Sequence, residues 1–407
     1  MNGPEGLFPL PLEEGRARAM ALFAETFATE PRGVWSAPGR VNLIGEHTDY
    51  NGGTCLPLAL PHRTFVALRP RPDALVRAVS AQRPGEVWRT SLGEVTPGRV
   101  DGWGAYVAGV AWALAQKGLR MTGFDVAVVS AVPTGAGLSS SAALECAVAL
   151  GLDESLDLGL ASDDAGRARL AAACVRAENE IVGAPTGGMD QAVSLRSRPG
   201  HALLLDTRDG SVRHVPLELA DHDAALLVID TRATHALVDG QYGLRRATCE
   251  AAARVLGGGT LREAELETAL ATLAAHGDLE IDLGADGTTT VSADVARRRV
   301  RHVVTEVARV DAVVGALAEG DLARVGALLD EGHRSLRDDY EVSCRELDLA
   351  CETATGAGAL GARMTGGGFG GSAVALVPAD RVEDVARAVA AAFAAAGLTA
   401  PAFLRAG

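Results

Sequence analysis

Lysine is almost missing from this sequence. Lys117, in the stretch ALAQKGLRM, is the single lysine among 407 residues, and no glycine-rich loop precedes it. A P-loop needs the pattern GxxxxGK[ST], and a protein kinase needs a lysine on a strand of its nucleotide site. Both kinds of site are therefore excluded, and any phosphate-binding site in this chain must work without lysine.

Long apolar runs and paired cysteines are also missing. No stretch offers the ~20 consecutive apolar residues that cross a membrane, and no N-terminal segment combines a basic start with an apolar run. The six cysteines are scattered, with no CxxC pair and no metal-ligand spacing. We therefore expect buried free thiols, no membrane partner and a cytoplasmic location.

The sequence has no excess of positive charge. Its formal net charge is -14, from 52 acidic residues against 38 lysines and arginines. Binding to nucleic acid without regard to base sequence relies on clustered basic residues, so we expect no nucleic-acid partner. What the chain does have is apolar content: 48% of its residues are hydrophobic. At domain sizes of ~100–200 residues, it can form two or three domains with a large core.

Strand-like and helical stretches divide the chain into two parts. From Pro38 to about Arg196, strand-like runs such as RTFVALRP and FDVAVVSAVP alternate with helical runs such as SAALECAVALGL. From Ala224, the strand AALLVID opens a more helical part that contains RRVRHVVTEVARVDAVVGAL. We expect domains over residues 1–222 and 223–407, packed closely with a ligand-binding cleft between them.

Several stretches near the end of the chain are expected to be loops. LGGGT and IDLGADGTTT read as loops, and RVEDVARAVAAAFAAAG reads as the closing helix. TGGGFGG, from Thr365 to Gly371, is expected to connect a helix with the strand SAVALV. Glycines cost roughly 0.5–1 kcal/mol each in regular structure, so such a cluster indicates a close backbone approach, or else a plain loop before the strand.

A second glycine-rich stretch, VPTGAGLSSSAALE, follows a strand and opens a helix. Backbone N–H groups and the positive dipole end of such a helix suit a phosphate, and serine hydroxyls can bind Mg²⁺. Ordinary helix capping is the alternative for this stretch taken alone. A dinucleotide-binding GxGxxG motif is disfavoured, because its third glycine is replaced by Ser140.

Three motifs in order give the sequence a family resemblance. PGRVNLIGEH near the start, PxxxGLSSSAA in the middle and GGGFGG near the end resemble the three motifs of the GHMP small-molecule kinases. Within that superfamily, GRVNLIGEHTDYNGG looks like the galactokinase signature. The match runs from Pro38 to about Val377, and the lack of a catalytic lysine also fits this superfamily.

The resemblance implies a fold and an activity. The implied fold class is α+β, a two-domain GHMP kinase fold with a ribosomal protein S5-like N-terminal domain and a ferredoxin-like C-terminal domain. The implied reaction is phosphorylation of the 1-hydroxyl of galactose by ATP with Mg²⁺, the first kinase step of galactose catabolism. Galactose and ATP are then the partners of a monomer or weak oligomer. Two alternatives stay open: a related kinase for N-acetylgalactosamine or arabinose, and a non-enzymatic sugar sensor.

The signature segment supplies the implied sugar site. Neighbouring hydroxyls need donors and acceptors held in place, and mispaired polar groups discriminate steeply against the wrong epimer. By resemblance, the sugar contacts are Glu46, His47, Thr48, Asp49, Gly187 and Tyr242. Standing alone, the segment would read as a solvated surface loop, and Tyr242 as a buried core residue.

The resemblance also assigns the chemistry. Asp190 is implied to receive the proton of the sugar 1-hydroxyl, and Arg40 to stabilise the reacting oxygens without losing its charge. Glu178 is implied to hold Mg²⁺ together with Ser141, although a lone helical glutamate is most often solvated. The implied triphosphate loop consists of Gly135, Ala136, Gly137, Leu138, Ser139, Ser140 and Ser141.

Two departures from the family pattern lie beside the implied sugar site. Gly188 stands where an aliphatic residue commonly precedes MDQ. Gly240 and Gln241 replace a more usual small-acid pair before Tyr242. These differences therefore weaken the expectation about which sugars the chain accepts.

Overall fold

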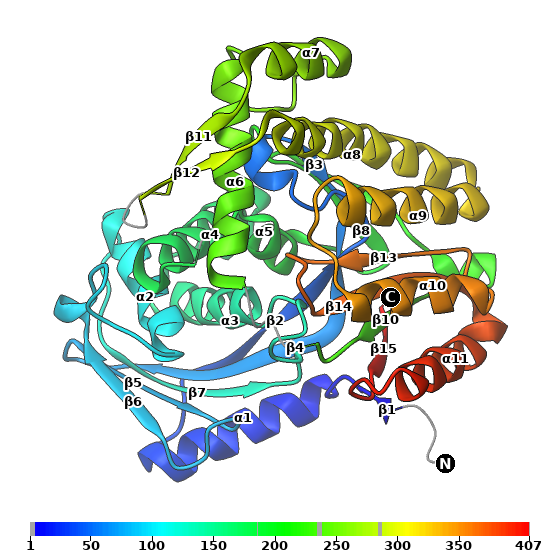
Figure 1. Ribbon diagram of the computed structural model, residues 1–407. Coiled ribbons are helices and arrows are strands. Elements are labelled where there is room, and N and C mark those ends of the chain that lie inside the picture. The colour runs from blue at the N-terminus through cyan, green and yellow to red at the C-terminus, as the bar shows by residue number, and fades with distance from the viewer. Residues whose placement is uncertain (1–4, 185, 234–237, 284–286, 407) are drawn as a thin grey trace.

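The computed structural model describes residues 5–184, 186–233, 238–283 and 287–406 (Figure 1). Two five-stranded sheets, each covered by helices, form the two main parts of the molecule. The helices are α1 Leu12–Phe27, α2 Gly104–Gln116, α3 Ser140–Ser155, α4 Asp164–Arg176, α5 Met189–Arg196, α6 Val238–Val255, α7 Leu266–His276, α8 Ala293–Glu319, α9 Leu322–Asp338, α10 Arg345–Gly356 and α11 Val382–Ala395. The strands are β1 Glu5–Gly6, β2 Gly33–Asn42, β3 Thr54–Cys55, β4 Pro57–Pro70, β5 Leu75–Ser80, β6 Val87–Ser91, β7 Phe124–Ser130, β8 His201–Asp206, β9 Val212–Pro216, β10 Ala224–Asp230, β11 Leu279–Asp282, β12 Thr288–Val291, β13 Gly361–Thr365, β14 Ser372–Pro378 and β15 Ala402–Ala406.

The first sheet has the strand order β2-β4-β7-β5-β6, with β5 and β7 parallel and the other neighbours antiparallel. Because side chains alternate along a strand, β4 sends Phe65 and Ala67 to one face and Val66 and Leu68 to the other. Helix α1 covers the first face, and α2, α3 and α4 cover the second (Figure 1). The sheet is therefore buried on both faces, as its apolar strands require.

The second sheet has the strand order β1-β15-β10-β14-β13, so the N-terminal strand joins the C-terminal part of the chain. Alternation along β10 places Leu227 and Ile229 in the core of the second part. Leu226 and Val228 lie in a different core, which also contains Val41 from the first part. The two parts therefore share a hydrophobic core and are packed closely, as the sequence predicts.

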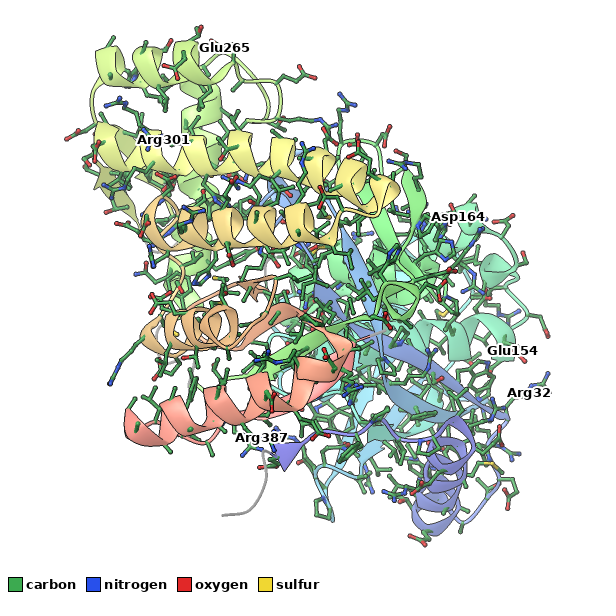
Figure 2. The ribbon with its side chains drawn as sticks, turned by 90° about the vertical axis from the view of Figure 1, so that its right-hand side faces the viewer. Arg32, Glu154, Asp164, Glu265, Arg301 and Arg387 are labelled. Carbon is green, nitrogen blue, oxygen red and sulfur yellow. The ribbon has the colours of Figure 1, made fainter. Side chains whose placement is uncertain are left out.

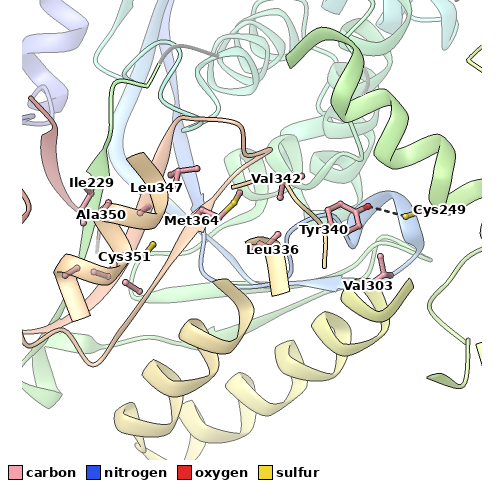
Figure 3. Close-up of a cluster of buried hydrophobic side chains, with 14 of the residues drawn as sticks. Ile229, Cys249, Val303, Leu336, Tyr340, Val342, Leu347, Ala350, Cys351 and Met364 are labelled. Carbon is pink, nitrogen blue, oxygen red and sulfur yellow. Dashed lines mark hydrogen bonds between the residues drawn. The ribbon is translucent and has the colours of Figure 1, made fainter. Parts of the chain in front are cut away.

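The core of the second part is formed largely by side chains from helices. Figure 3 shows Leu336, Tyr340, Leu347 and Met364 of this cluster, which lies between β13 and the helices around it. Its members come from segments far apart in the sequence. The hydroxyl group of Tyr340 lies 3.2 Å from the sulfur of Cys249. This contact places two polar groups within the apolar core.

The cysteines are free, as the sequence predicts, and several charged side chains lie at the periphery of the molecule. Figure 2 shows Glu154, Asp164 and Arg387 at the periphery of the molecule. The cysteines are free and buried, except for Cys344, which is partly exposed. Within the described residues, no helix is both long enough and apolar enough to cross a membrane.

Some local expectations are wrong. The stretch IDLGADGTTT forms parts of the hairpin strands β11 and β12 rather than only a loop. The glycine-rich turn after Thr365 follows a strand, β13, and not a helix. The chain also ends in a strand, β15, beyond the expected closing helix α11. Strand β13 is buried throughout, so its sequence lacks a period-2 pattern, and β11 alternates over only four residues, which is too short to predict a strand.

Candidate active site

A cavity of about 180 Å³ lies where both parts of the chain meet. Its lining residues are Arg40, Glu46, His47, Asp49, Glu178, Thr186, Met189, Asp190, Tyr242, Gly366 and Gly367. The volume is below the roughly 300–1,000 Å³ typical of pockets for drug-sized molecules. Because most of its side chains are polar or charged, the cavity suits a compact and highly polar ligand.

Arg40 and Asp190 form an ion pair on one wall of this cavity. Arg40 follows an irregularity in the β2–β4 pairing, and such bulges change the direction of nearby side chains. Its Nε donates to Asp190 Oδ1 at 2.9 Å, and its Nη2 lies 2.9 Å from the same oxygen. Asp190 lies in the first turn of α5, where the helix dipole also favours a carboxylate. The carboxylate is therefore held in a fixed orientation.

The glycine-rich loop before α3 contacts this ion pair. Arg40 Nη1 donates to the carbonyl oxygen of Gly137 at 2.6 Å, and the Ser139 hydroxyl donates to Asp190 Oδ2. Ser139 has φ 58°, a left-handed conformation that costs energy in a residue with a side chain and clusters at functional sites. Helix α3 begins directly after it, so a helix N-terminus, which favours negative charge, lies beside Asp190.

The two glycine-rich segments lie against each other. A Cβ atom on Gly366 would lie 3.1 Å from the carbonyl oxygen of Gly137. The Ser372 hydroxyl donates to the carbonyl oxygen of Ala136 at 2.7 Å. The close backbone approach that the glycines indicate is therefore confirmed, and its partner is the loop before α3.

Glu178 and Ser141 place two side-chain oxygen groups that could ligate a cation near Asp190. Glu178 lies in the π-helical segment Ala177–Val182 after α4, hydrogen-bonds with Ser141 and accepts from Gln191 Nε2 at 2.6 Å. Burial, and next the charge of Asp190, raise the pKa of Glu178 to about 7. Such oxygens suit a hard cation. Among the described residues, no group of three His, Cys, Asp or Glu side chains could hold a metal ion, so a cation here needs further ligands from substrate or water.

Glu46 is held from behind the cavity by the second part of the chain. Its Oε2 lies 2.5 Å from Arg363 Nη2, and its Oε1 accepts from Gly366 N at 3.1 Å and from the Thr365 hydroxyl at 3.2 Å. Burial raises the pKa of Glu46, although the charge of Arg363 opposes this effect. Arg363 is completely buried and also pairs with Glu306 at 2.9 Å.

Asp49, His47 and Tyr242 complete the polar lining. Burial, and then the charge of Asp190, raise the pKa of Asp49 to about 6. Burial lowers the pKa of His47 well below its ordinary value and raises the pKa of Tyr242 well above its own. A Cβ atom on Gly187 would lie 2.1 Å from Asp49 Oδ2, so only glycine leaves room for this carboxylate.

Other sequence-predicted positions lie away from the cavity wall. Thr48 does not line the cavity, because its Oγ1 is turned to the carbonyl oxygens of Gly45 and Thr54, at 2.8 Å each. The segment Gly135–Ser141 also lies outside the lining and reaches the site through its contacts with the ion pair. Thr234 to Leu237, which precede the helix α6 that carries Tyr242, lie outside the described residues.

Sequence reasoning missed several residues that shape the site. Thr186 and Met189 line the cavity, and Arg363 and Glu306 support Glu46 from behind. Met189 is the first residue of the MDQ stretch and Thr186 lies three positions before it, which was a usable signal. Nothing local links Arg363 with Glu306, because they lie on separate elements, β13 and α8, that α9 brings together. Gly188 has φ 95°, which glycine adopts without strain.

Family models match three successive regions of the chain. Residues 21–70 match the galactokinase galactose-binding signature. Residues 105–198 match the N-terminal domain of GHMP kinases, and residues 313–395 match their C-terminal domain. These regions contain β2 and the following loop, the helices α3 to α5, and the β13–β14 turn.

Curated proteins and solved structures are similar over nearly the whole chain. The chain is 50% identical to a galactokinase of Streptomyces coelicolor over 93% of both chains. It is 46% identical to a galactokinase of Mycobacterium tuberculosis, covering 91% of this chain and 96% of that protein. The structure of Lactococcus lactis galactokinase in complex with galactose matches with a TM-score of 0.83 and 34% identity, over 95% of this chain and 96% of that one. Methanococcus jannaschii mevalonate kinase, at 16% identity and a TM-score of 0.56, shares the fold. The chain therefore belongs to the galactokinase family of GHMP kinases.

Proposed function

We propose that this chain transfers the γ-phosphoryl group of ATP to the 1-hydroxyl of α-D-galactose, giving galactose 1-phosphate and ADP. The observation that carries this proposal is the position of Asp190. Its carboxylate faces the polar cavity, while Arg40 and Ser139 tie it to the loop before α3. A group so placed lies between a sugar and a triphosphate.

The cavity lining supports a role in sugar recognition. Asp49 and Glu46 offer carboxylate oxygens as acceptors for sugar hydroxyls, and His47 and Tyr242 offer neutral polar groups. Gly187 leaves the space that the Asp49 carboxylate occupies. Thr48 supports the loop that carries these residues and need not touch the sugar itself.

The loop before α3 supports a role in nucleotide binding. Free backbone N–H groups at the start of α3 and the glycines of Gly135–Ser141 favour a triphosphate without any lysine. The glycine-rich β13–β14 turn closes on this loop from the second part of the chain. Positioning and electrostatic stabilisation are the main needs of phosphoryl transfer, and both are available here.

The residues beside this loop fit Mg²⁺. Burial and the neighbouring charge of Asp190 disfavour the ionised form of Glu178, and a cation would relieve this cost. Ser141 and Glu178 supply the oxygen ligands that a hard cation prefers. When bound there, Mg²⁺ would supply positive charge that offsets the charge of the phosphate groups.

Proton transfer then falls to Asp190. Its carboxylate accepts the proton of the 1-hydroxyl as the oxygen attacks the γ-phosphorus, and Arg40 stabilises the charge that develops on the reacting oxygens. Arg40 also keeps Asp190 and the carbonyl oxygen of Gly137 at fixed separations. One guanidinium therefore aligns the base with the phosphate loop.

A product assay tests the proposed function. Purified protein with Mg-ATP should release ADP with galactose, and phosphorus NMR should locate the new phosphate on the anomeric carbon. N-acetylgalactosamine and arabinose belong in the same assay, because they separate galactose specificity from a related kinase activity. Phosphate on the 6-hydroxyl, or no ADP release with any sugar, would contradict the proposal.

Galactose binding should weaken as the pH falls through 6. Below the pKa of about 6, Asp49 takes up a proton and can no longer accept hydrogen bonds with both oxygens. If only the ionised form binds, affinity falls about tenfold between pH 7 and pH 5. Calorimetry with a non-hydrolysable ATP analogue present measures this change.

Asp49→Asn is the matched variant for this pH experiment. It should bind galactose weakly with a flat profile over this range and keep its affinity for nucleotide. Glu178→Gln should retain the wild-type pH dependence, because Glu178 is assigned to the metal. A flat wild-type profile, or a pH-dependent Asp49→Asn variant, would remove Asp49 from the sugar site.

Glu178→Gln should raise the Mg²⁺ concentration needed for half-maximal rate by about tenfold or more. The substitution keeps the shape of the side chain and removes a charge that a hard cation needs. A rate titration with MgCl₂ at saturating galactose measures the effect. Glu180→Gln is the control, since Glu180 lies two residues away and pairs with Arg176 on the surface. Equal titrations for wild type and Glu178→Gln would exclude Glu178 as a metal ligand.

A further inference from the structure

Three of the four tyrosines in the sequence surround His47. Ring centroids of Tyr50, Tyr242 and Tyr340 lie 5.9, 5.5 and 4.7 Å from that of His47. Tyr50 shares the loop of His47, Tyr242 comes from α6, and Tyr340 follows α9. Only Tyr242 of these three lines the cavity together with His47. Tyr50 and Tyr340 therefore act on the site from behind it.

A chain of hydrogen bonds links His47 to the core of the second part. His47 Nδ1 lies 2.8 Å from the Tyr50 hydroxyl, which lies 2.8 Å from the Tyr340 hydroxyl. The Tyr340 hydroxyl in turn lies 3.2 Å from Cys249 Sγ (Figure 3). Tyr340 and Cys249 are completely buried. This series of hydrogen bonds thus ends in the core, away from solvent.

The acceptor strengths of these groups determine which partner donates in each hydrogen bond of the series. An unprotonated imidazole nitrogen is a better acceptor than a phenol oxygen, and a phenol oxygen is a better acceptor than a thiol sulfur. Tyr50 therefore donates to His47 Nδ1, Tyr340 donates to Tyr50, and Cys249 donates to Tyr340. Burial lowers the pKa of His47 and raises those of Tyr50 and Tyr340, so each keeps the single proton that this arrangement needs. Asn51 supports the far end by hydrogen-bonding with Cys249.

The remaining nitrogen of His47 has no partner. His47 is 5% exposed, and its Nε2 is buried without a hydrogen bond to any described residue. The backbone of His47 has φ 62°, a left-handed conformation, and Asn51 Nδ2 donates to its carbonyl oxygen at 2.8 Å. The loop is thus held in an unfavourable conformation that places an unpartnered ring nitrogen at the cavity.

We propose that Tyr50, anchored by Tyr340, is a positioning residue that holds His47 in the Nε2–H tautomer, so that Nε2–H donates to an oxygen of the bound sugar. This inference rests on the proposed function for the identity of the ligand. A buried N–H without an acceptor is costly, and a sugar oxygen removes that cost. Because one tautomer is fixed before binding, the site discriminates in favour of a ligand that presents an acceptor to His47.

Tyr50→Phe tests the proposal, because it keeps the ring contact with Tyr242 and removes only the hydroxyl. The dissociation constant and KM for galactose should rise about 3- to 10-fold, the reach of one hydrogen bond. The kcat at saturating galactose and the KM for ATP should stay within twofold. Tyr340→Phe should give a smaller rise in the same constant. This split between KM and kcat separates positioning from a general loss of structure.

Histidine NMR reads the tautomer directly. Long-range proton–nitrogen correlations of the free protein, labelled with ¹⁵N at histidine and assigned with His47→Gln, should show His47 as Nε2–H. In Tyr50→Phe the same ring should show both tautomers. Thr64→Val is the control, since it removes another buried hydroxyl pair, with Ser130, from the first sheet. It should change neither the tautomer nor the galactose affinity.

Two results would overturn the proposal. The first is an Nδ1–H tautomer of His47 in the wild-type protein, and the second is wild-type galactose affinity in Tyr50→Phe. Absence of turnover by the wild-type protein would instead contradict the proposed function, because the tautomer is read without substrate. If Tyr50→Phe does not fold, Tyr340→Phe supplies the same comparison from the next hydroxyl in the chain.

Discussion

Asp190→Asn should lower kcat by about 10²–10⁴, the usual reach of general acid–base catalysis. The amide keeps the size of the carboxylate and one acceptor oxygen, but it cannot take the proton of the 1-hydroxyl. Galactose affinity should stay within a few fold, because Glu46 and Asp49 remain in the cavity. Single-turnover kinetics and galactose calorimetry measure the two quantities separately.

Arg40 gives this prediction a second and sharper form. Arg40→Ala should also lower kcat, because it removes the guanidinium that contacts both Asp190 and the carbonyl oxygen of Gly137. Since the two groups act as one unit, the double variant should lose much less than the product of the single losses. Independent multiplication of the two losses would show that Arg40 and Asp190 act in separate steps.

A matched carboxylate keeps the Asp190 experiment interpretable. Asp164→Asn removes an exposed carboxylate that pairs at 2.8 Å with the buried Arg196, and it should leave kcat near the wild-type value. Near-wild-type turnover of Asp190→Asn, in an assay limited by chemistry, would contradict the assignment of the base. Asp49 and Glu46, the other cavity carboxylates that are not assigned to the metal, would then be tested.

The parts of the site that could be predicted from sequence are those that a short segment specifies by itself. The stretch from Val132 to Glu145 follows strand β7 and opens helix α3, because glycines permit the turn and serines begin the helix. The signature loop after β2 likewise carries its polar residues within a few positions of one another. Such local patterns allow a family resemblance to be recognised, and the comparisons confirm it.

The parts that could not be predicted depend on contacts between distant segments. Arg363 lies on β13, yet its partners Glu46 and Glu306 lie in the loop after β2 and on α8. No spacing in the sequence relates these positions. The short strand β13 was missed for a related reason, because a strand buried on both faces shows no alternation. Packing on both faces leaves β13 without an alternating pattern, and it also brings Arg363 to the loop after β2.

Arg363→Met should lower the free energy of unfolding by about 3–5 kcal/mol at neutral pH, as is typical when one partner of a buried ion pair is removed. The substitution leaves Glu46 and Glu306 buried without their shared guanidinium. Arg309 still contacts Glu306, but no other cation in the described residues pairs with Glu46. Urea unfolding measures the loss, and Arg363→Lys should recover part of it by restoring the charge without the two-sided geometry.

The control for this loss is a surface ion pair. Arg387 is exposed on α11 and pairs with Asp384, so Arg387→Met should cost no more than about 1 kcal/mol (Figure 2). A loss of similar size in both variants would mean that burial of the Arg363 ion pairs does not increase the loss of unfolding free energy. A loss confined to Arg363→Met identifies burial as the cause.

The contribution of Glu306 to stability should change with pH in opposite directions in the wild type and in Arg363→Met. In the wild type, burial opposes ionisation of Glu306, but Arg363 and its other charged neighbours lower the pKa of Glu306 to about 2 from an ordinary value of 4.5. Its stabilising effect is therefore present above pH 4.5 and is lost as the pH falls toward 2. Without Arg363, burial raises the pKa of Glu306 and adds to the rise that burial already causes in Glu46, so protonation stabilises the variant and its stability falls as the pH rises. The difference in unfolding free energy between wild type and Arg363→Met should therefore be larger at pH 8 than at pH 5, and an equal difference at both values would contradict the ionic role of Arg363.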